Sequence, residues 1–124
     1  MATINVSDAT GVVLDWLVAK CEGAPTEIIP ADGQLGAFWI GKGDNARAYS
    51  TKWAAGGPII DELLRSGLNI TQGGPLAAND RVWVYRKETN RFYHGATLLI
   101  AAMRCYVASK LGDTVEVPDE LLAA

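Results

Sequence analysis

Hydrophobic residues are most concentrated near the end of the chain, in the stretch LLIAAMRCYVASKL. Thr97 can cap a helix at the start of this stretch, and Gly112 can end it. Apart from Arg104, the run carries no charge until Lys110. A helix that is apolar on almost every side is covered on almost every side. The pattern therefore predicts a central buried helix over residues 97–111.

A second helix is predicted near the start of the chain. Ser7 or Thr10 can serve as its N-cap, and Gly23 stands where a left-handed residue would end it. The apolar positions between them recur at helical spacing: Leu14, Leu17, Val18 and Cys21. The charged positions fall largely off this stripe and are expected to face solvent: Asp15, Lys20 and Glu22.

A third helix is predicted after the glycine pair Gly56 and Gly57. Pro58 suits the first position of a helix because its φ angle is already fixed, and Gly67 can end the helix. The residues of its buried stripe would be Ile59, Ile60, Leu63 and Leu64. This helix is short and has a clear start and end in the sequence.

Strand patterns are fewer. Residues 81–87 (RVWVYRK) alternate, so that Trp83 and Tyr85 share one face, and residues 91–94 can return antiparallel after a turn at 88–90. Weaker strand candidates lie at residues 3–6, 38–40, 68–71 and 114–117. The order and spacing predict a single α+β domain over residues 1–124, with a small antiparallel sheet packed on about three helices. The stretch 24–48 shows little periodicity, and we expect it to be largely irregular.

Composition narrows the function classes. The net charge is -3, which argues against a dedicated binder of duplex nucleic acid, because such a protein needs a broad basic face. Two cysteines and the lone His94 cannot assemble a zinc site of the usual spacing, so we expect no metal and no other cofactor. The start lacks a signal-peptide pattern, and no apolar run is long enough to span a bilayer, so we expect a cytoplasmic protein without a membrane partner.

Three stretches carry a resemblance to a known family. LDWLVAKCEG (14–23), YSTKWAAGGPII (49–60) and GATLLIAAMRCYVASKLGDTVEVPDEL (95–121) resemble the signature blocks of the phage NinX-like family. The chain departs from the family pattern at Lys52, where relatives usually carry an acidic residue, and at His94, where they usually carry tyrosine. The resemblance implies a small accessory protein made in the cytoplasm of an infected bacterium. The family is one of unknown function, so the resemblance implies no particular activity.

Ligand-binding chemistry is concentrated just before the third predicted helix. The start of a helix offers unpaired backbone N–H groups that favour phosphate or carboxylate, and glycines let a ligand approach the backbone. Hydroxyls, a cation and two flat aromatic faces precede it, which together are the parts of a nucleotide-sized site. The candidates are Tyr49, Ser50, Thr51, Lys52, Trp53, Gly56 and Gly57. The alternative is that the two aromatic residues only fill the core ahead of the helix.

Three further residues join the ligand-binding candidates. Arg104 cannot lose its proton inside an apolar helix, so it needs an anion or several acceptors. Either an internal carboxylate supplies them or a ligand phosphate does; the carboxylates considered are Asp15, Asp61 and Asp113. Trp39 is expected at a surface or lid, and His94 lies at a strand-to-helix junction.

These observations predict a non-catalytic binder of a small anionic, nucleotide-type ligand. By analogy with other small phage proteins, it would sequester signalling molecules of host defence. One alternative is a protein–protein interaction module that inhibits or redirects a host protein. Another is a small nucleotide-processing enzyme, although no nucleophile or metal site is visible in the sequence. Trp83 with Tyr85 also predicts a symmetric contact between copies of the chain, and hence a homo-oligomer.

Overall fold

The computed structural model describes residues 2–24, 26–30, 38–40, 49–50, 52–72, 82–86 and 91–122. The helices are η1 (Val6–Asp8), α1 (Gly11–Glu22), α2 (Trp53–Arg65), α3 (Leu98–Leu111) and α4 (Asp119–Leu122). The strands are β1 (Ala2–Asn5), β2 (Ile28–Pro30), β3 (Phe38–Ile40), β4 (Leu68–Gln72), β5 (Val82–Arg86), β6 (Arg91–Gly95) and β7 (Thr114–Val117).

The described strands pair antiparallel, which confirms the α+β prediction, but they divide among three small sheets. β1 pairs with β7, β2 pairs with β3, and β4, β5 and β6 form a three-stranded sheet in that order. Strand β2 lies in the stretch 24–48, where no regular structure was predicted for residues 28–30. The pairing partner of β2 is ten residues further along the chain, so the short apolar run alone did not reveal the strand. The turn predicted at residues 88–90 lies outside the described residues.

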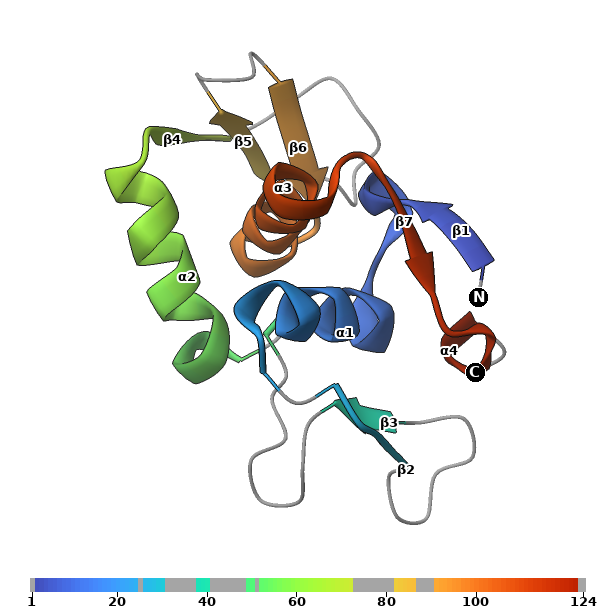
Figure 1. Ribbon diagram of the computed structural model, residues 1–124. Coiled ribbons are helices and arrows are strands. Elements are labelled where there is room, and N and C mark those ends of the chain that lie inside the picture. Colours follow the sequence, from blue (N-terminus) through green and yellow to red (C-terminus); the bar gives the residue numbers. More distant parts are fainter. Residues whose placement is uncertain are drawn as a thin grey trace.

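Helix α3 is central, as its apolar sequence predicts (Figure 1). It packs against β5 and β6 on one side and against α1 and α2 on the others. Residues 101–108 are buried without interruption. The Thr97 side chain accepts a hydrogen bond from the Ile100 N–H at 3.2 Å, and Gly112 ends the helix with a φ of 93°. The predicted start, end and burial of this helix are therefore confirmed.

Helix α1 has the predicted bounds, but one of its charged residues does not face solvent. The helix follows Thr10 and ends at Gly23, whose φ is 68°. Asp15 is only 7% exposed, so its expected position on the wet face is wrong. The reason is that α1 packs against α3 on one side and β3 on the other, which buries residues 14–19 all round the helix (Figure 1).

Helix α2 starts earlier than its sequence suggests. Its first residue is Trp53 and its N-cap is Lys52, so Pro58 lies inside the helix rather than at its start. The Ala55 and Gly56 N–H groups both donate to the Lys52 carbonyl, at 3.1 and 2.9 Å. Proline removes one donor, which would otherwise bond the carbonyl four residues earlier. That carbonyl belongs to Ala54, which is exposed. Water can therefore replace the missing donor, and the helix tolerates the proline.

The glycine pair within α2 has two different environments. A Cβ atom at Gly56 would lie 2.4 Å from the Tyr49 carbonyl oxygen and 2.7 Å from a methyl carbon of Leu99. A Cβ atom at Gly57 would meet only the Trp53 ring, at an ordinary 3.5 Å. Gly56 is therefore required for the close packing of α2 against α3 and the preceding chain, whereas Gly57 is not required for space.

Gly56→Ala should destabilise the protein by about 1–3 kcal/mol or more, because the backbone oxygen of Tyr49 cannot move aside without shifting the chain. Gly57→Ala is the matched control and should stabilise by about 0.5–1 kcal/mol, since alanine is the better helix former. Denaturant unfolding of both variants measures the two changes. Equal effects of the two substitutions would contradict the close packing at Gly56.

Candidate functional site

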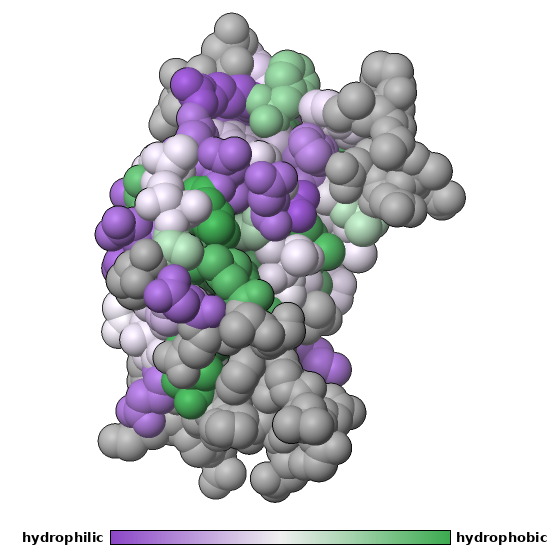
Figure 2. Space-filling view, turned by 90° about the vertical axis from the view of Figure 1, so that its right-hand side faces the viewer, coloured by the Kyte–Doolittle hydropathy of each residue, from purple (hydrophilic) through white to green (hydrophobic). Residues whose placement is uncertain are grey.

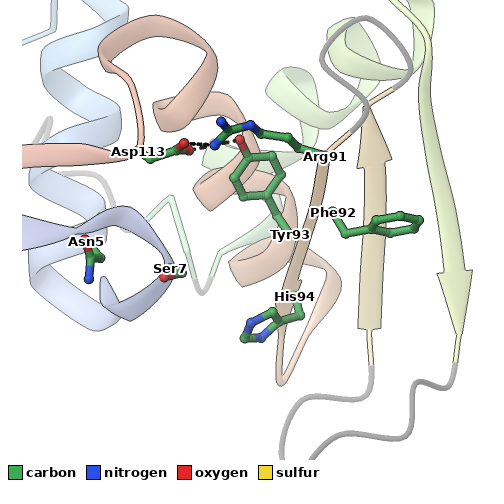
Figure 3. Close-up of a pocket in the computed structure, with 7 residues that line it drawn as sticks. All are labelled: Asn5, Ser7, Arg91, Phe92, Tyr93, His94 and Asp113. Carbon is green, nitrogen blue, oxygen red and sulfur yellow. Dashed lines mark hydrogen bonds and ion pairs between the residues drawn. The ribbon is translucent and has the colours of Figure 1, made fainter.

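A pocket of about 390 Å³ opens at strand β6, one of the two outer strands of the three-stranded sheet. Three separate parts of the chain form its walls: the end of β1 with η1, strand β6, and the junction between α3 and β7 (Figure 3). Its lining residues are Asn5, Ser7, Arg91, Phe92, Tyr93, His94 and Asp113. The walls therefore carry an amide, hydroxyls, an imidazole, a guanidinium and a carboxylate.

Arg104 holds two of these walls together from inside the protein. Its Nε donates to the Ala9 carbonyl and its Nη1 to the His94 carbonyl, both at 2.8 Å. The side chain is 8% exposed. Both acceptors are backbone carbonyls, so these two bonds are neither the carboxylate pair nor the ligand contact considered from the sequence. They connect the end of β6 to the loop before α1, across the central helix.

The third wall of the pocket, at the junction between α3 and β7, is held in place by a backbone hydrogen bond and by an ion pair. The Val6 N–H donates to the Asp113 carbonyl at 2.8 Å. Arg91 forms an ion pair with the Asp113 carboxylate, and the Tyr93 hydroxyl donates to the same carboxylate at 3.3 Å (Figure 3). Burial raises the pKa of Tyr93, with a further contribution from Cys105, so the hydroxyl stays protonated and remains a donor at neutral pH.

The pocket contains a serine, a histidine and an aspartate, but not in the arrangement of a catalytic triad. A triad needs the histidine between the nucleophile and an orienting carboxylate. Here the Asp113 carboxylate bonds Arg91 and Tyr93, while His94 lies at the other end of the pocket (Figure 3). Within the described ranges, no group of three or more histidine, cysteine or acidic side chains could hold a metal ion.

The site predicted ahead of α2 is partly buried. Tyr49 is buried, and Ser50 is 1% exposed. The Ser50 N–H donates to the Asp15 carboxylate at 2.7 Å, and its hydroxyl donates to the Gly11 carbonyl at 3.4 Å. These hydrogen bonds hold the chain before α2 against α1. The polar atoms of Ser50 are therefore already bonded within the protein.

The remaining candidates near α2 are more accessible. Lys52 is exposed, and Trp53 is 57% exposed. Because α2 starts at Trp53, the amides at the helix start are those of Trp53 and Ala54, and the helix begins five residues before Pro58, its predicted first position. Thr51 lies outside the described residues, as does the side chain of Trp39, whose backbone belongs to β3.

The structure therefore brings the sequence candidates together in two groups. Tyr49, Ser50 and Gly56 meet in the interior at the start of α2, and Arg104 meets the backbone of His94. Most of the pocket lining was missed: Asn5, Ser7, Arg91, Phe92, Tyr93 and Asp113. No local motif joins these residues, because they come from three segments far apart in the sequence. The alternation of side chains along residues 91–94, which places Arg91 and Tyr93 on the same face, was the one sequence pattern that pointed to any of these lining residues.

Two further hollows have mostly apolar walls. One of about 520 Å³ follows the outer side of α2 and is lined by Trp53, Gly57, Pro58, Ile60, Asp61 and Leu64. Another of about 520 Å³ is lined by Ile4, Asp8, Thr10, Val12, Val13, Leu121 and Leu122. The face that carries β1, β7 and α4 accordingly shows hydrophobic residues among hydrophilic ones (Figure 2).

Comparison with known families agrees with the resemblance noted in the sequence. The chain matches the model of the family described as Bacteriophage P22, NinX over residues 5–110, and it belongs to this family. It is therefore a phage accessory protein. The comparison with curated proteins gave no match. Among the described residues, no helix is long and apolar enough to cross a membrane.

Replacing Arg104 tests the anchor beneath the pocket. Arg104→Met leaves the Ala9 and His94 carbonyls without these donors, so the free energy of unfolding should fall by about 2–5 kcal/mol. Arg104→Lys should recover only part of the loss, because one ammonium group cannot reproduce the planar fork. Denaturant unfolding gives the values, with the exposed Arg65→Met as control. An Arg104→Met protein as stable as the parent would exclude the anchoring role.

Asp15 should make stability depend on pH. Burial raises the pKa of Asp15, against the opposing hydrogen bonds from Ser50. The folded state therefore binds the proton more tightly than the unfolded chain. This contribution to stability is complete below the ordinary pKa of about 4 and is lost as pH rises through the higher folded-state pKa.

Asp15→Asn keeps an oxygen for the Ser50 N–H but cannot ionise. The melting temperature of Asp15→Asn relative to the parent should therefore rise between pH 4 and pH 8. Thermal unfolding at several pH values measures this difference, and the exposed Glu116→Gln controls for the loss of one negative charge. A difference that stays constant across this range would show that Asp15 has no raised pKa.

Proposed function

We propose that this phage accessory protein is a non-catalytic binder of a small anionic, nucleotide-type ligand, held in the pocket at β6. The observation that carries the proposal is the convergence of polar groups from three segments on a pocket of about 390 Å³. This volume lies within the roughly 300–1,000 Å³ typical of small-molecule sites. The Arg104 anchor supports the proposal, because a preorganised pocket loses less entropy when a ligand binds.

The lining residues offer groups that match a nucleotide. The Arg91 guanidinium suits a phosphate, and the hydroxyls of Ser7 and Tyr93 suit its oxygens or a sugar. The Tyr93 ring, which lies on the same side of β6 as Arg91 (Figure 3), offers a flat face to a base. These groups supply the cation, the hydrogen bonds and the stacking surface that the sequence-based hypothesis placed ahead of α2.

The ion pair between Arg91 and Asp113 does not prevent an anion from binding. The two side chains are 58% and 49% exposed, and an ion pair this accessible contributes roughly 0–1 kcal/mol. A phosphate can therefore compete with the carboxylate for the Arg91 guanidinium. The start of α2, with the exposed Lys52 and Trp53, is retained as a second location for the anionic group.

In an infected bacterium, such a binder would sequester a signalling nucleotide of host defence. This step rests on analogy with other small phage proteins and on the membership of the chain in a phage family. A non-catalytic protein can act in this way only if it is made in amounts comparable to its ligand. Tight binding is therefore the property to measure first.

A second candidate function is a protein–protein interaction that inhibits or redirects a host protein. The observation that favours it is the hollow of about 520 Å³ on the outer side of α2. Trp53 and Leu64 at its rim are 57% and 45% exposed, and exposed large apolar side chains of this kind often mark protein interfaces.

Titration with nucleoside monophosphates and cyclic dinucleotides tests the proposed function. Ligand at a hundred times its Kd should stabilise the fold by about 2.7 kcal/mol, seen as a higher melting temperature. Arg91→Gln should weaken binding by roughly 10- to 150-fold, the loss of a charge-assisted hydrogen bond. Arg65→Gln removes a more accessible positive charge from α2 and should leave affinity unchanged.

Lys52→Gln separates the two locations. If Lys52→Gln lowers affinity and Arg91→Gln does not, the ligand binds at the start of α2 and the pocket assignment is wrong. If none of the nucleotides binds the parent protein at millimolar concentration, the proposed function itself is wrong. Both readouts need only the folded chain and a calorimeter or a thermal-shift assay.

A further inference from the structure

Two arginines are neighbours at one end of the β5–β6 pair. In the antiparallel register, Arg86 is the partner of Arg91, and Val84 is the partner of Tyr93. Opposed residues point to the same side of a sheet, and so do residues two apart along a strand. Val84 is fully buried, so this is the side of the sheet that packs on α3. Both arginines therefore lie on the α3 side, which is also the side of the pocket (Figure 3).

Arg86 lies next to the pocket rather than in its lining. The side chain is half-buried, and its guanidinium donates a hydrogen bond to the sulfur of Cys105 on α3. Burial raises the pKa of Tyr93, and the positive charges of Arg91 and Arg86 oppose that rise. This effect requires both guanidiniums to lie near the phenol ring. Arg86 and Arg91 therefore converge on Tyr93, from two strands.

The charges around Tyr93 are unequal. Among the described residues that line the pocket, Asp113 carries the one carboxylate, and it accepts from both Arg91 and Tyr93. The C-terminal end of α3, two residues before Asp113, adds a partial negative charge of about half a unit. The turn sequence between the two arginines, KETN at residues 87–90, has no net charge. Two like charges directly opposite each other in a sheet repel, so a positive excess remains that an anion would stabilise.

We propose that Arg86 and Arg91 together bind one terminal phosphate group of the ligand, so that the ligand is a phosphomonoester. This inference rests on the proposed function of the pocket and names the class of its ligand. A terminal phosphate has three free oxygens and between one and two negative charges at neutral pH, which match two guanidinium forks and the Tyr93 hydroxyl. A guanidinium has five N–H donors, so Arg86 can bond a sulfur and a phosphate oxygen together. A phosphodiester, with two free oxygens and one charge, matches these donors less well.

The Asp113 carboxylate is an internal competitor for the same donors. It accepts from Arg91 and Tyr93, which are two of the three groups assigned to the phosphate (Figure 3). A bound phosphate takes these donors from the carboxylate, and the two anions repel each other. Loss of the Asp113 charge should therefore raise the affinity for a terminal phosphate.

The test is calorimetric titration of the folded chain with the 5′-monophosphates of adenosine, guanosine, cytidine and uridine. The tightest of these is then compared with its phosphate methyl ester, which differs by one methyl group and lacks one charge and one free oxygen. The monophosphate should bind at least about 5-fold more tightly than the methyl ester. This factor is the effect of one unit charge at close range in a dielectric like that of water.

Two variants test the assigned residues. Arg86→Gln should weaken binding of the monophosphate by roughly 10- to 150-fold, the loss of a charge-assisted hydrogen bond, and Arg86→Lys should recover part of it. Asp113→Asn should strengthen binding by about 5-fold or more. Asp61→Asn is the matched control, because Asp61 also pairs with an exposed arginine, Arg65, but on α2. It should leave affinity unchanged, and thermal unfolding shows which variants are folded.

Failure of this inference differs from failure of the proposed function. If no monophosphate binds the parent at millimolar concentration, the proposed function is wrong and the inference falls with it. If the monophosphate binds but its methyl ester binds as tightly or more tightly, the pocket keeps its ligand and the terminal-phosphate assignment is wrong. Parent-like affinity in a folded Arg86→Gln also overturns the assignment. If Arg86→Gln does not fold, unchanged or lower affinity in Asp113→Asn overturns it alone.

Discussion

The buried guanidinium of Arg104 constrains the rest of the structure. It cannot give up its charge, so every folded arrangement of the apolar helix α3 must supply acceptors at this point. The Ala9 and His94 carbonyls do so, from the loop before α1 and from the end of β6. These two carbonyls are far apart in the sequence, and their hydrogen bonds to Arg104 hold α3 against both segments. The same two bonds set the spacing between two walls of the pocket, so fold stability and site geometry depend on one side chain.

A second buried polar contact has a similar role between α1 and the chain before α2. The Asp15 carboxylate accepts the Ser50 N–H, which holds the chain before α2 against α1. Gly56 then allows α2 to approach Tyr49 and Leu99 more closely than any side chain would permit. Polar groups that looked available for a ligand are therefore used to position helices. A serine or aspartate near the start of a helix can form a buried hydrogen bond within the protein as readily as it can bind a ligand.

Strand β6 presents different side chains on its two sides, because alternate side chains of a strand face opposite ways. Arg91 and Tyr93 point to Asp113 and form the polar pocket, while Phe92 points the other way. One strand therefore supplies both the polar wall of the pocket and an exposed ring on its other side.

The sequence by itself determined the existence of the three longer helices, α1, α2 and α3, and most of the strands. Local rules suffice for these, as Thr97 and Gly112 show for α3, because capping, periodicity and alternation act over a few residues. Only the tertiary structure decided that Asp15 is buried, that α2 starts at Trp53, and that Arg104 bonds carbonyls. It also decided the pocket, whose walls come from three distant segments. The physical reason is that burial and acceptor geometry depend on what packs alongside a residue, and its sequence neighbours do not specify that.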